Sequence, residues 1–180
     1  MTVKTKYHYN KRHSRVGIML EHCKNTFERW GGVSRIIDGW LQQRQELIVE
    51  FCTVSGVHEL AADSNQDHDQ GMHHFCELMV DYISAGHFEV YDHLIQEAEE
   101  FGDNMALELA KKIYPQISQT TEHALSFNDA LEGMINHEPN SPSLAHELSK
   151  IGETLVTRFE LEDQMVERMH DSHKDLVANA

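Results

Sequence analysis

Apolar residues recur every three or four positions along most of this chain, which is the spacing of amphipathic helices rather than strands. The first long helix is expected from Ser34, a plausible N-cap, to about Val54. Its apolar face comprises Ile37, Trp40, Leu41, Ile48, Phe51 and Cys52. A shorter helix is expected before it, over residues 20–30, where Gly31 and Gly32 end it.

The second long helix is expected to follow a polar loop at residues 56–71 and to contain Gly86. Its apolar face comprises Phe75, Leu78, Met79, Tyr82, Ile83, Val90, Leu94 and Ile95, which keep helical phase on both sides of this glycine. We favour one continuous helix, bent at Gly86, because a break would leave two stubs too short to match the other helices. A turn at Gly86 is the alternative. In a continuous helix, the small residues Ser84, Ala85 and Gly86 would let another backbone approach closely.

The third long helix is separated from the second by a short capping sequence. Gly102 is expected to end the second helix, and Asp103 with Asn104 to cap the start of the third. The third helix is expected over residues 107–135, with Pro115 kinking it or marking a local break.

The last long helix is expected after a loop at residues 136–143, with Ser141 as its cap and Pro142 at its first position. Its apolar face comprises Leu144, Leu148, Ile151, Leu155, Phe159, Leu161 and Met165, after which the sequence becomes a polar tail.

Four long helices of similar length, joined by short or polar connections, predict an all-α fold. The expected architecture is an antiparallel up-down four-helix bundle with a short extra N-terminal helix. Residues 1–18 are basic and hold few apolar groups, so we expect a flexible tail there. Residues 19–176 are expected to form a single helical-bundle domain.

The net charge of −15 is unevenly spread along the 180 residues. From Gln45 to Ala110 there are fifteen Asp and Glu residues and no Lys or Arg, whereas Met1 to Arg44 holds nine basic residues and three acids. An acidic stretch without basic residues makes a strong local field that repels nucleic acid and attracts a basic partner. The alternative is that the acids serve solubility alone.

Histidines and acids are numerous, but their spacing gives no catalytic or metal-binding motif. A di-iron bundle needs two Glu-x-x-His motifs on partner helices, and the sequence has one, Glu167–His170, in the polar C-terminal tail. H-E-x-x-H, G-x-S-x-G and phosphate-binding glycine motifs are absent from the sequence. Two isolated pairs are expected to be solvated surface groups: His73–Glu77 and His93–Glu97. We therefore predict no enzyme activity, no metal and no cofactor.

The sequence also indicates a cytoplasmic protein. Cys23, Cys52 and Cys76 are an odd number without metal-site spacing, and they are expected to be small buried side chains in a reducing compartment. No apolar run approaches the 18 residues of a membrane span, and the basic start is not followed by the apolar region of a secretory signal.

Several segments in order resemble one known family. VDYISAGHFEVYDHL (80–94) resembles the signature of the Rsd/AlgQ family, the regulators of sigma D. IIDGWLQQRQELIVEF (36–51), KKIYPQI (111–117) and IGETLVTRFELEDQMV (151–166) resemble further helices of that family. MLEHCKNTFERWGGV (19–33) is similar to the start of its AlgQ branch.

The resemblance implies a helical-bundle anti-sigma factor that binds region 4, the C-terminal region of the primary sigma factor. Region 4 is a helix-turn-helix module that contacts the −35 promoter element, so its working surface is basic. An acidic protein can occupy this surface in place of phosphates and also block its contact with core polymerase. We expect no membrane partner, no specific nucleic acid, and a monomer in the sigma complex. The alternative is a helical adaptor that binds a phosphocarrier or another signalling protein.

Asp81, Ser84 and Phe88 fall at i, i+3 and i+7, which is one face of a helix. Here Asp81 can accept hydrogen bonds, Ser84 offers a small polar contact and Phe88 an apolar anchor. The predicted protein-binding residues are Asp38, Trp40, Asp81, Ser84, Phe88 and Asp92. Two alternatives stay open. In the first, Phe88 and Tyr91 are core residues and Asp81 is a buried acid with satisfied hydrogen bonds. In the second, Trp40 is a core residue with its indole N–H satisfied rather than a binding hot spot.

Overall fold

The computed structural model describes residues 33–56, 65–137 and 142–173, and in these ranges every regular element is helical. A helix covers residues 33–54 and is followed by α2 (Asn65–Ala85), η1 (Gly86–Val90), α3 (Tyr91–Phe101), α4 (Asn104–His137), α5 (Pro142–Val166) and η2 (Glu167–Asp171). The predicted all-α class is confirmed. The expected helix at 20–30 and the expected tail at 1–18 lie outside the described residues.

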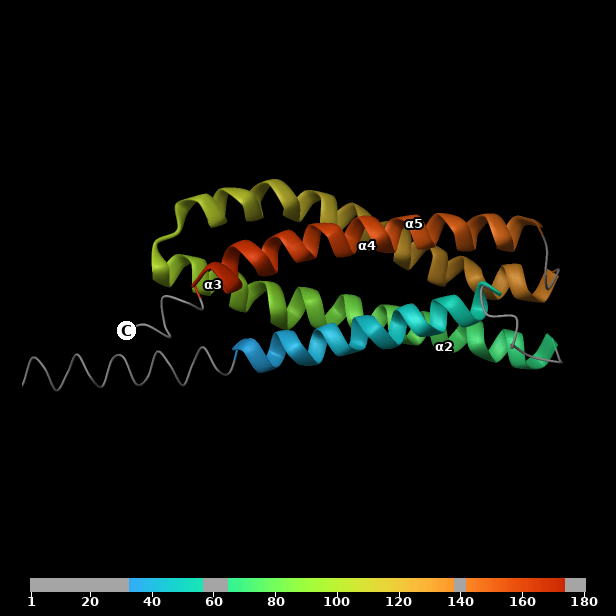
Figure 1. Ribbon diagram of the computed structural model, residues 1–180. Helices are drawn as coiled ribbons and strands as arrows, with labels where there is room; N and C mark the ends of the chain where they lie inside the picture. Colours follow the sequence, from blue (N-terminus) through green and yellow to red (C-terminus); the bar gives the residue numbers. More distant parts are fainter. Residues whose placement is uncertain (1–32, 57–64, 138–141, 174–180) are drawn as a thin grey trace, which may run out of the picture.

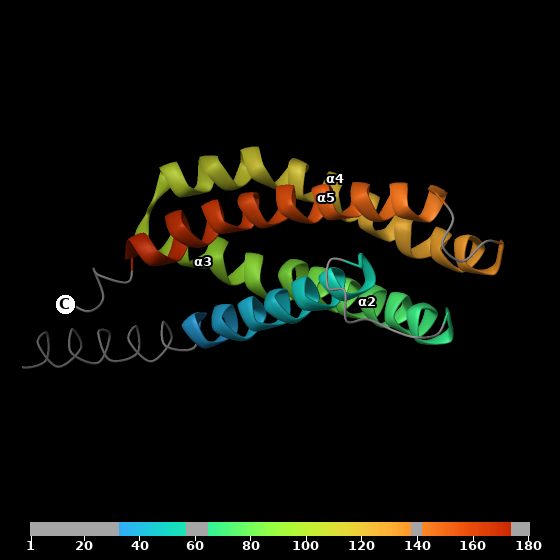
Figure 2. The same cartoon turned by 45° about the vertical axis from the view of Figure 1, so that its right-hand side comes forward.

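The long helices alternate in direction along the bundle, as an up-down arrangement requires (Figure 1). The helix at 33–54 runs one way, α2 and α3 return, α4 runs out again and α5 comes back. Figure 2 shows the same rods as two layers, with α4 and α5 on one side and the 33–54 helix and α2 on the other. The core lies between these layers, where Leu47, Phe75, Met79, Leu94, Ile117 and Met165 are fully buried.

The helix is continuous across Gly86, and the turn that contains this glycine is a π-helix, η1, inserted between α2 and α3. Gly86 does allow a close approach, but the neighbours are aromatic side chains rather than the expected backbone. A Cβ at this position would lie 2.9 Å from the Tyr91 hydroxyl and 3.2 Å from the Trp40 ring. Because glycine has no side chain, the two buried rings of Tyr91 and Trp40 fit against this turn.

Gly86→Ala is expected to lower the free energy of unfolding by about 1–3 kcal/mol, because overpacking a well-filled core displaces its neighbours. The measurement is a denaturant or thermal melt of the purified protein. Gly39→Ala is the matched control: Gly39 is also helical and exposed, and a Cβ there would meet nothing within 4 Å. Alanine at this control position is expected to stabilise by up to about 1 kcal/mol. Equal stability of the two variants would contradict the packing role of Gly86.

Three boundaries differ from the sequence prediction. Helix α2 begins at Asn65, so the expected loop at 56–71 is wrong for residues 65–71. Ser34 is not a cap, because residue 33 is already helical, and its hydroxyl instead meets His170. Helix α4 begins at Asn104 rather than at Leu107, and it is continuous through Pro115, so of the two alternatives for this proline the local break is wrong.

The junction between α3 and α4 is as predicted. Gly102 adopts a left-handed conformation with φ of 65° at the end of α3, which is the usual role of glycine there. The Asp103 carboxylate accepts hydrogen bonds from the backbone N–H groups of Met105 and Ala106, at 3.1 and 3.0 Å, and so caps α4. No helix in the described part of the chain is long and apolar enough to cross a membrane.

Candidate protein-binding site

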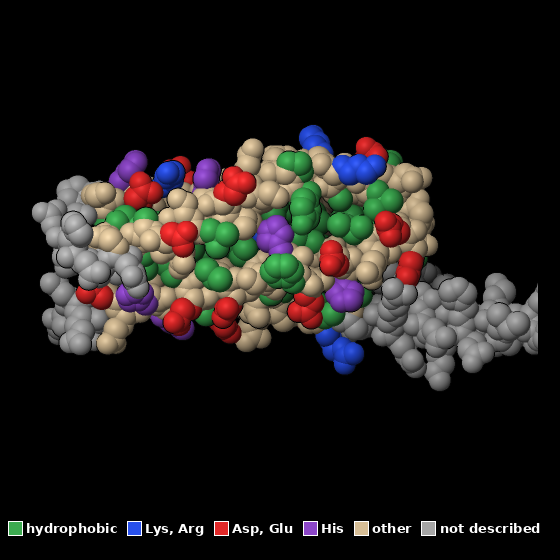
Figure 3. All heavy atoms as spheres, turned by 180° about the vertical axis from the view of Figure 1, so that it is seen from behind, with side chains coloured by type: hydrophobic (Ala, Val, Ile, Leu, Met, Phe, Trp, Pro, Cys, Tyr) green, Lys and Arg blue, Asp and Glu red, His purple; other side chains and the backbone are tan. Residues whose placement is uncertain are grey.

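The side chain of Phe88 stands out on the surface, because 85% of it is exposed. It projects from η1, and Asp81, Glu89 and Asp92 on the same continuous helix are exposed as well. Figure 3 shows the bundle from behind, and on that face hydrophobic side chains gather among acidic ones and few basic ones. A large exposed aromatic ring surrounded by acids is typical of a binding surface rather than of a core position.

The structure does not bring all six predicted residues to one surface. Asp81, Ser84, Phe88 and Asp92 lie along α2, η1 and α3, with Ser84 half-buried and the other three exposed. Asp38 is exposed on the separate helix at 33–54. The binding role of these residues stays a prediction.

Trp40 lies in the core, with 2% of its surface exposed. Its ring stacks on Tyr82 at a centroid distance of 5.1 Å, and its indole N–H donates to the Tyr82 carbonyl at 3.1 Å. Of the two alternatives for Trp40, the structure therefore has the core residue with a satisfied N–H. Tyr91 is also buried, whereas Phe88 is not, so the core alternative is right for Tyr91 and wrong for Phe88.

A polar centre lies inside the bundle. It is formed around Glu162 of α5, whose side chain is fully buried. The carboxylate of Glu162 accepts hydrogen bonds from the hydroxyls of Tyr82 and Tyr91. It also pairs with two guanidinium groups, Arg158 at 2.7 Å and Arg44 at 3.2 Å. These partners come from the helix at 33–54, α2, α3 and α5, so one carboxylate joins four helical segments.

Arg158 extends the polar centre to α4. Its side chain is fully buried, and Nη1 donates to the hydroxyls of Thr120 and Thr121 at 3.1 and 2.8 Å. Nη2 donates to the Tyr91 hydroxyl at 2.8 Å. A buried charge is tolerated only when it is paired and hydrogen-bonded, and Arg158 with Glu162 meets both conditions.

The two phenols of the centre remain protonated donors. Burial, followed by the nearby negative charge of Glu162, raises the pKa of Tyr82 and of Tyr91 above the ordinary range. Neither phenol ionises near neutral pH, so each hydroxyl keeps donating its hydrogen bond to the Glu162 carboxylate in that pH range.

His87 connects the polar centre with the surface turn that carries Phe88. Its Nε2 lies 2.9 Å from the Thr121 hydroxyl, and its ring packs edge-on against Tyr91 and Tyr114 at 5.2 and 5.9 Å. Burial, and then the charge of Arg158, lowers the pKa of His87. A neutral imidazole therefore lies beside the exposed phenylalanine.

A second buried cluster lies at the C-terminal end of the described chain, where the sequence predicted a polar tail. His170 donates from Nδ1 to Glu97 at 2.8 Å, while its Nε2 lies 2.9 Å from the Ser34 hydroxyl. His173 donates to the Met169 carbonyl at 2.9 Å. The expectation of solvated groups is wrong for Glu97, which is 2% exposed and whose pKa is raised by burial, an effect that His170 partly offsets.

These histidines do not form a metal centre in the part of the chain that the structure describes, because no group of three or more His, Cys, Asp or Glu side chains there is placed to hold an ion. Glu167 of the lone Glu-x-x-His motif is exposed, whereas His170 points inward to Glu97. The cluster is a set of buried hydrogen bonds that joins the C-terminal end of the described chain to α3 and to the helix at 33–54.

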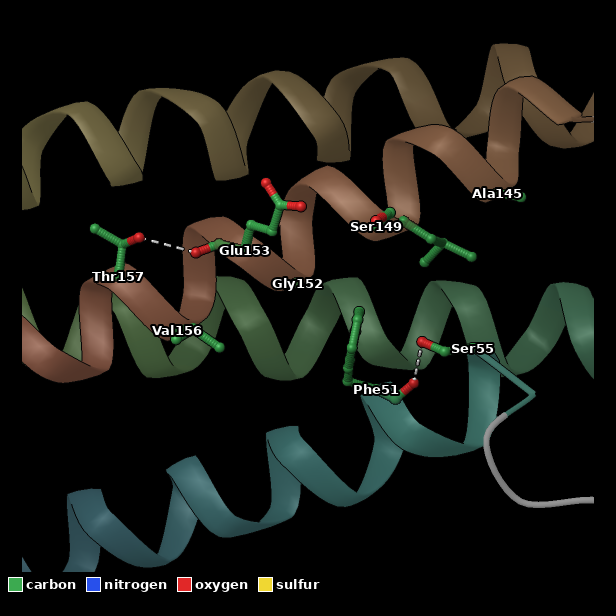
Figure 4. A pocket seen from close by; sticks show the side chains of 9 residues that line it. Phe51, Ser55, Ala145, Ser149, Gly152, Glu153, Val156 and Thr157 are labelled. Atoms are coloured by element: carbon green, nitrogen blue, oxygen red, sulfur yellow. Dashed lines mark hydrogen bonds between the residues drawn. The ribbon is translucent and has the colours of Figure 1, made fainter.

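A groove between the 33–54 helix and α5 is lined by Phe51, Leu148, Gly152 and Val156 and has a volume of about 720 Å³. Figure 4 shows the Phe51 ring directed at α5 near Gly152. A Cβ on Gly152 would lie 2.6 Å from this ring, so the glycine permits the close packing of the two helices.

Sequence reasoning missed the charged members of the polar centre, although one signal was present. Arg158 and Glu162 are spaced at i, i+4 and interrupt the apolar face that Leu155 and Met165 define on α5. Charged residues on the apolar face of a helix indicate a buried, paired site.

Comparison with known proteins shows the family to which the chain belongs. Residues 19–170 match the family described as regulator of the RNA polymerase sigma(70) subunit, Rsd/AlgQ. A protein named Regulator of sigma D from Yersinia enterocolitica serotype O:8 / biotype 1B is 33% identical over 149 residues, which cover 83% of this chain and 89% of that protein. One of the same name from Salmonella paratyphi B is 33% identical over 158 residues, covering 87% and 95%. The chain therefore belongs to the Rsd/AlgQ family of sigma(70) regulators.

Proposed function

We propose that this protein is an anti-sigma factor that binds region 4 of the primary sigma factor through the face around Phe88. By covering region 4, it blocks the contacts with the −35 promoter element and with core polymerase, and so regulates transcription. The family description and the relatives named Regulator of sigma D support a sigma factor as the partner.

The observation that carries the proposal is the exposure of Phe88 on a turn flanked by acids. An aromatic side chain that is 85% exposed in the free protein gains most when a partner covers it. Aromatic residues at the centre of an interface commonly dominate its binding energy. A phenylalanine in the core could not contact a partner. The structure excludes this alternative, because the Phe88 ring is exposed.

The charge on this face suits a basic partner. Asp81, Glu89 and Asp92 are exposed around Phe88, and the chain has no Lys or Arg from position 45 to position 110. A helix-turn-helix module presents Lys and Arg to phosphates, so an acidic face is complementary to it. Charge of this kind steers association, while apolar contacts set the lifetime of the complex.

The association rate with the isolated region 4 is expected to fall roughly tenfold or more from low to high salt, because ions screen the attraction between the two surfaces. Stopped-flow or surface-based kinetics at several salt concentrations give this rate, and the dissociation rate should change much less. An association rate that is flat across the salt series would rule out the acidic face as the docking surface. Failure of region 4 to bind at any salt concentration would rule out the function itself.

A further inference from the structure

We infer that the apolar groove between α3 and α4 is a second part of the same docking surface and holds the apolar side of a basic amphipathic helix of the partner. This inference rests on the proposed function. The groove has a volume of about 610 Å³, within the range of about 300–1,000 Å³ that is common for binding sites.

One wall of the groove continues from Phe88. Asp92, Ile95 and Glu99 lie at i, i+3 and i+7 of α3, which places these three residues on one side of the helix, and Phe88 lies in the π-helical turn directly before it. Ile95 and Glu99 line the groove itself. The exposed ring of Phe88 therefore lies next to the start of the helix that forms this wall, and a partner that covers the Phe88 turn can extend along the groove.

The opposite wall belongs to α4 and is also connected to the Phe88 turn. Leu107, Ala110, Tyr114 and Pro115 line it at helical spacing. The Tyr114 ring is 40% exposed and packs against His87, the residue next to Phe88. Apolar surface therefore continues from the exposed phenylalanine through His87 and Tyr114 into the groove.

The charges at the rim favour a basic occupant. Asp92 and Glu99 are exposed along the α3 wall. Lys111 is the basic residue that lines the groove, and its ammonium lies 2.8 Å from the Glu108 carboxylate. A helix that presents apolar residues at i, i+3, i+4 and i+7 with Lys or Arg beside them matches both the apolar walls and the acidic rim.

Two charge variants test the rim against region 4. Glu99→Lys is expected to weaken binding about tenfold or more, and Lys111→Glu is expected to tighten it several-fold, both mainly through the association rate. Lys150→Glu is the matched control, because Lys150 is an exposed helical lysine with an acid three residues before it, as Lys111 is, but lies on α5. This control should change affinity by less than about twofold at moderate salt.

A third variant tests the apolar wall. Ile95→Thr keeps the branched shape but introduces a hydroxyl, so the dissociation rate is expected to rise and affinity to fall about tenfold. Val156→Thr makes a similar change at an exposed position of α5 and should leave affinity unchanged. Thermal melts of each variant separate a loss of contact from a loss of fold.

The outcomes distinguish the groove from the face around Phe88. If the groove variants bind region 4 as the unaltered protein does while Phe88→Ala binds weakly, the groove inference is overturned and the proposed function stands. If Phe88→Ala also binds normally, both are overturned. If the groove variants change self-association in light scattering but not binding to region 4, the occupant is a second copy of this chain and the inference is again overturned.

Discussion

Replacing Glu162 by alanine is expected to lower the free energy of unfolding by about 3–5 kcal/mol, because removal of one partner leaves a buried charge uncompensated. Glu162 and Arg158 are both fully buried, and the hydroxyls of Tyr82 and Tyr91 would lose their acceptor at the same time. Chemical denaturation followed by circular dichroism measures the effect. In a domain of this size it corresponds to a fall in Tm on the order of 10 °C.

The neighbouring acid provides the control for this variant. Asp163 also pairs with Arg44, at 2.5 Å, but its side chain is 63% exposed. Asp163→Ala is therefore expected to cost about 1 kcal/mol or less, since exposed ion pairs contribute little. If the two alanine variants were equally stable, Glu162 could not be the organising charge of the bundle. Replacing Arg158 by methionine in the Glu162→Leu background should restore part of the lost stability, because the fully buried guanidinium is then gone, while Arg44 keeps its ion pair with Asp163.

Phe88→Ala is expected to weaken binding to sigma region 4 by about 2–4 kcal/mol, which is roughly 30- to 1,000-fold in Kd. The ring is exposed in the free protein, so its removal should change the melting temperature little. Isothermal titration calorimetry beside a thermal melt separates the two quantities. Unchanged stability with weakened binding is the signature of an interface residue.

A matched variant shows whether any exposed apolar residue has this effect. Val156 is 56% exposed on α5, and Val156→Ala should leave both binding and stability nearly unchanged. A Phe88→Ala protein that binds region 4 normally would place the sigma-binding surface elsewhere. A Phe88→Ala protein that melts much earlier would mean that the ring supports the fold.

Most of the fold could be predicted because its determinants are local. Apolar spacing indicated the four long helices, and Gly102 with Asp103 marked the junction of α3 and α4 correctly. The π-helical turn at Gly86 could not be predicted, because apolar spacing does not distinguish it from an α-helix, and its close neighbours Trp40 and Tyr91 are known only from the structure. The early start of α2 was missed because residues 65–71 contain no apolar position from which amphipathic spacing could be recognised.

The surface around Phe88 could be predicted from the sequence, whereas the polar centre around Glu162 could not. The spacing of Phe88 and Asp81 and a family resemblance indicated that these residues bind a partner. The sequence left open whether Phe88 is a core residue, and its exposure in the structure shows that it is not. The partners of Glu162 lie as many as 118 residues away along the chain, at Arg44. No periodic pattern predicts which distant side chain meets a buried acid, so the polar centre required the three-dimensional structure.

The hydrogen bond between Ser34 and His170 has a consequence for the order of folding, because it joins positions 136 residues apart. Closing a loop of this length is entropically costly before the intervening helices have packed. We therefore expect the contact between Ser34 and His170 to form late in folding, after the intervening helices have packed.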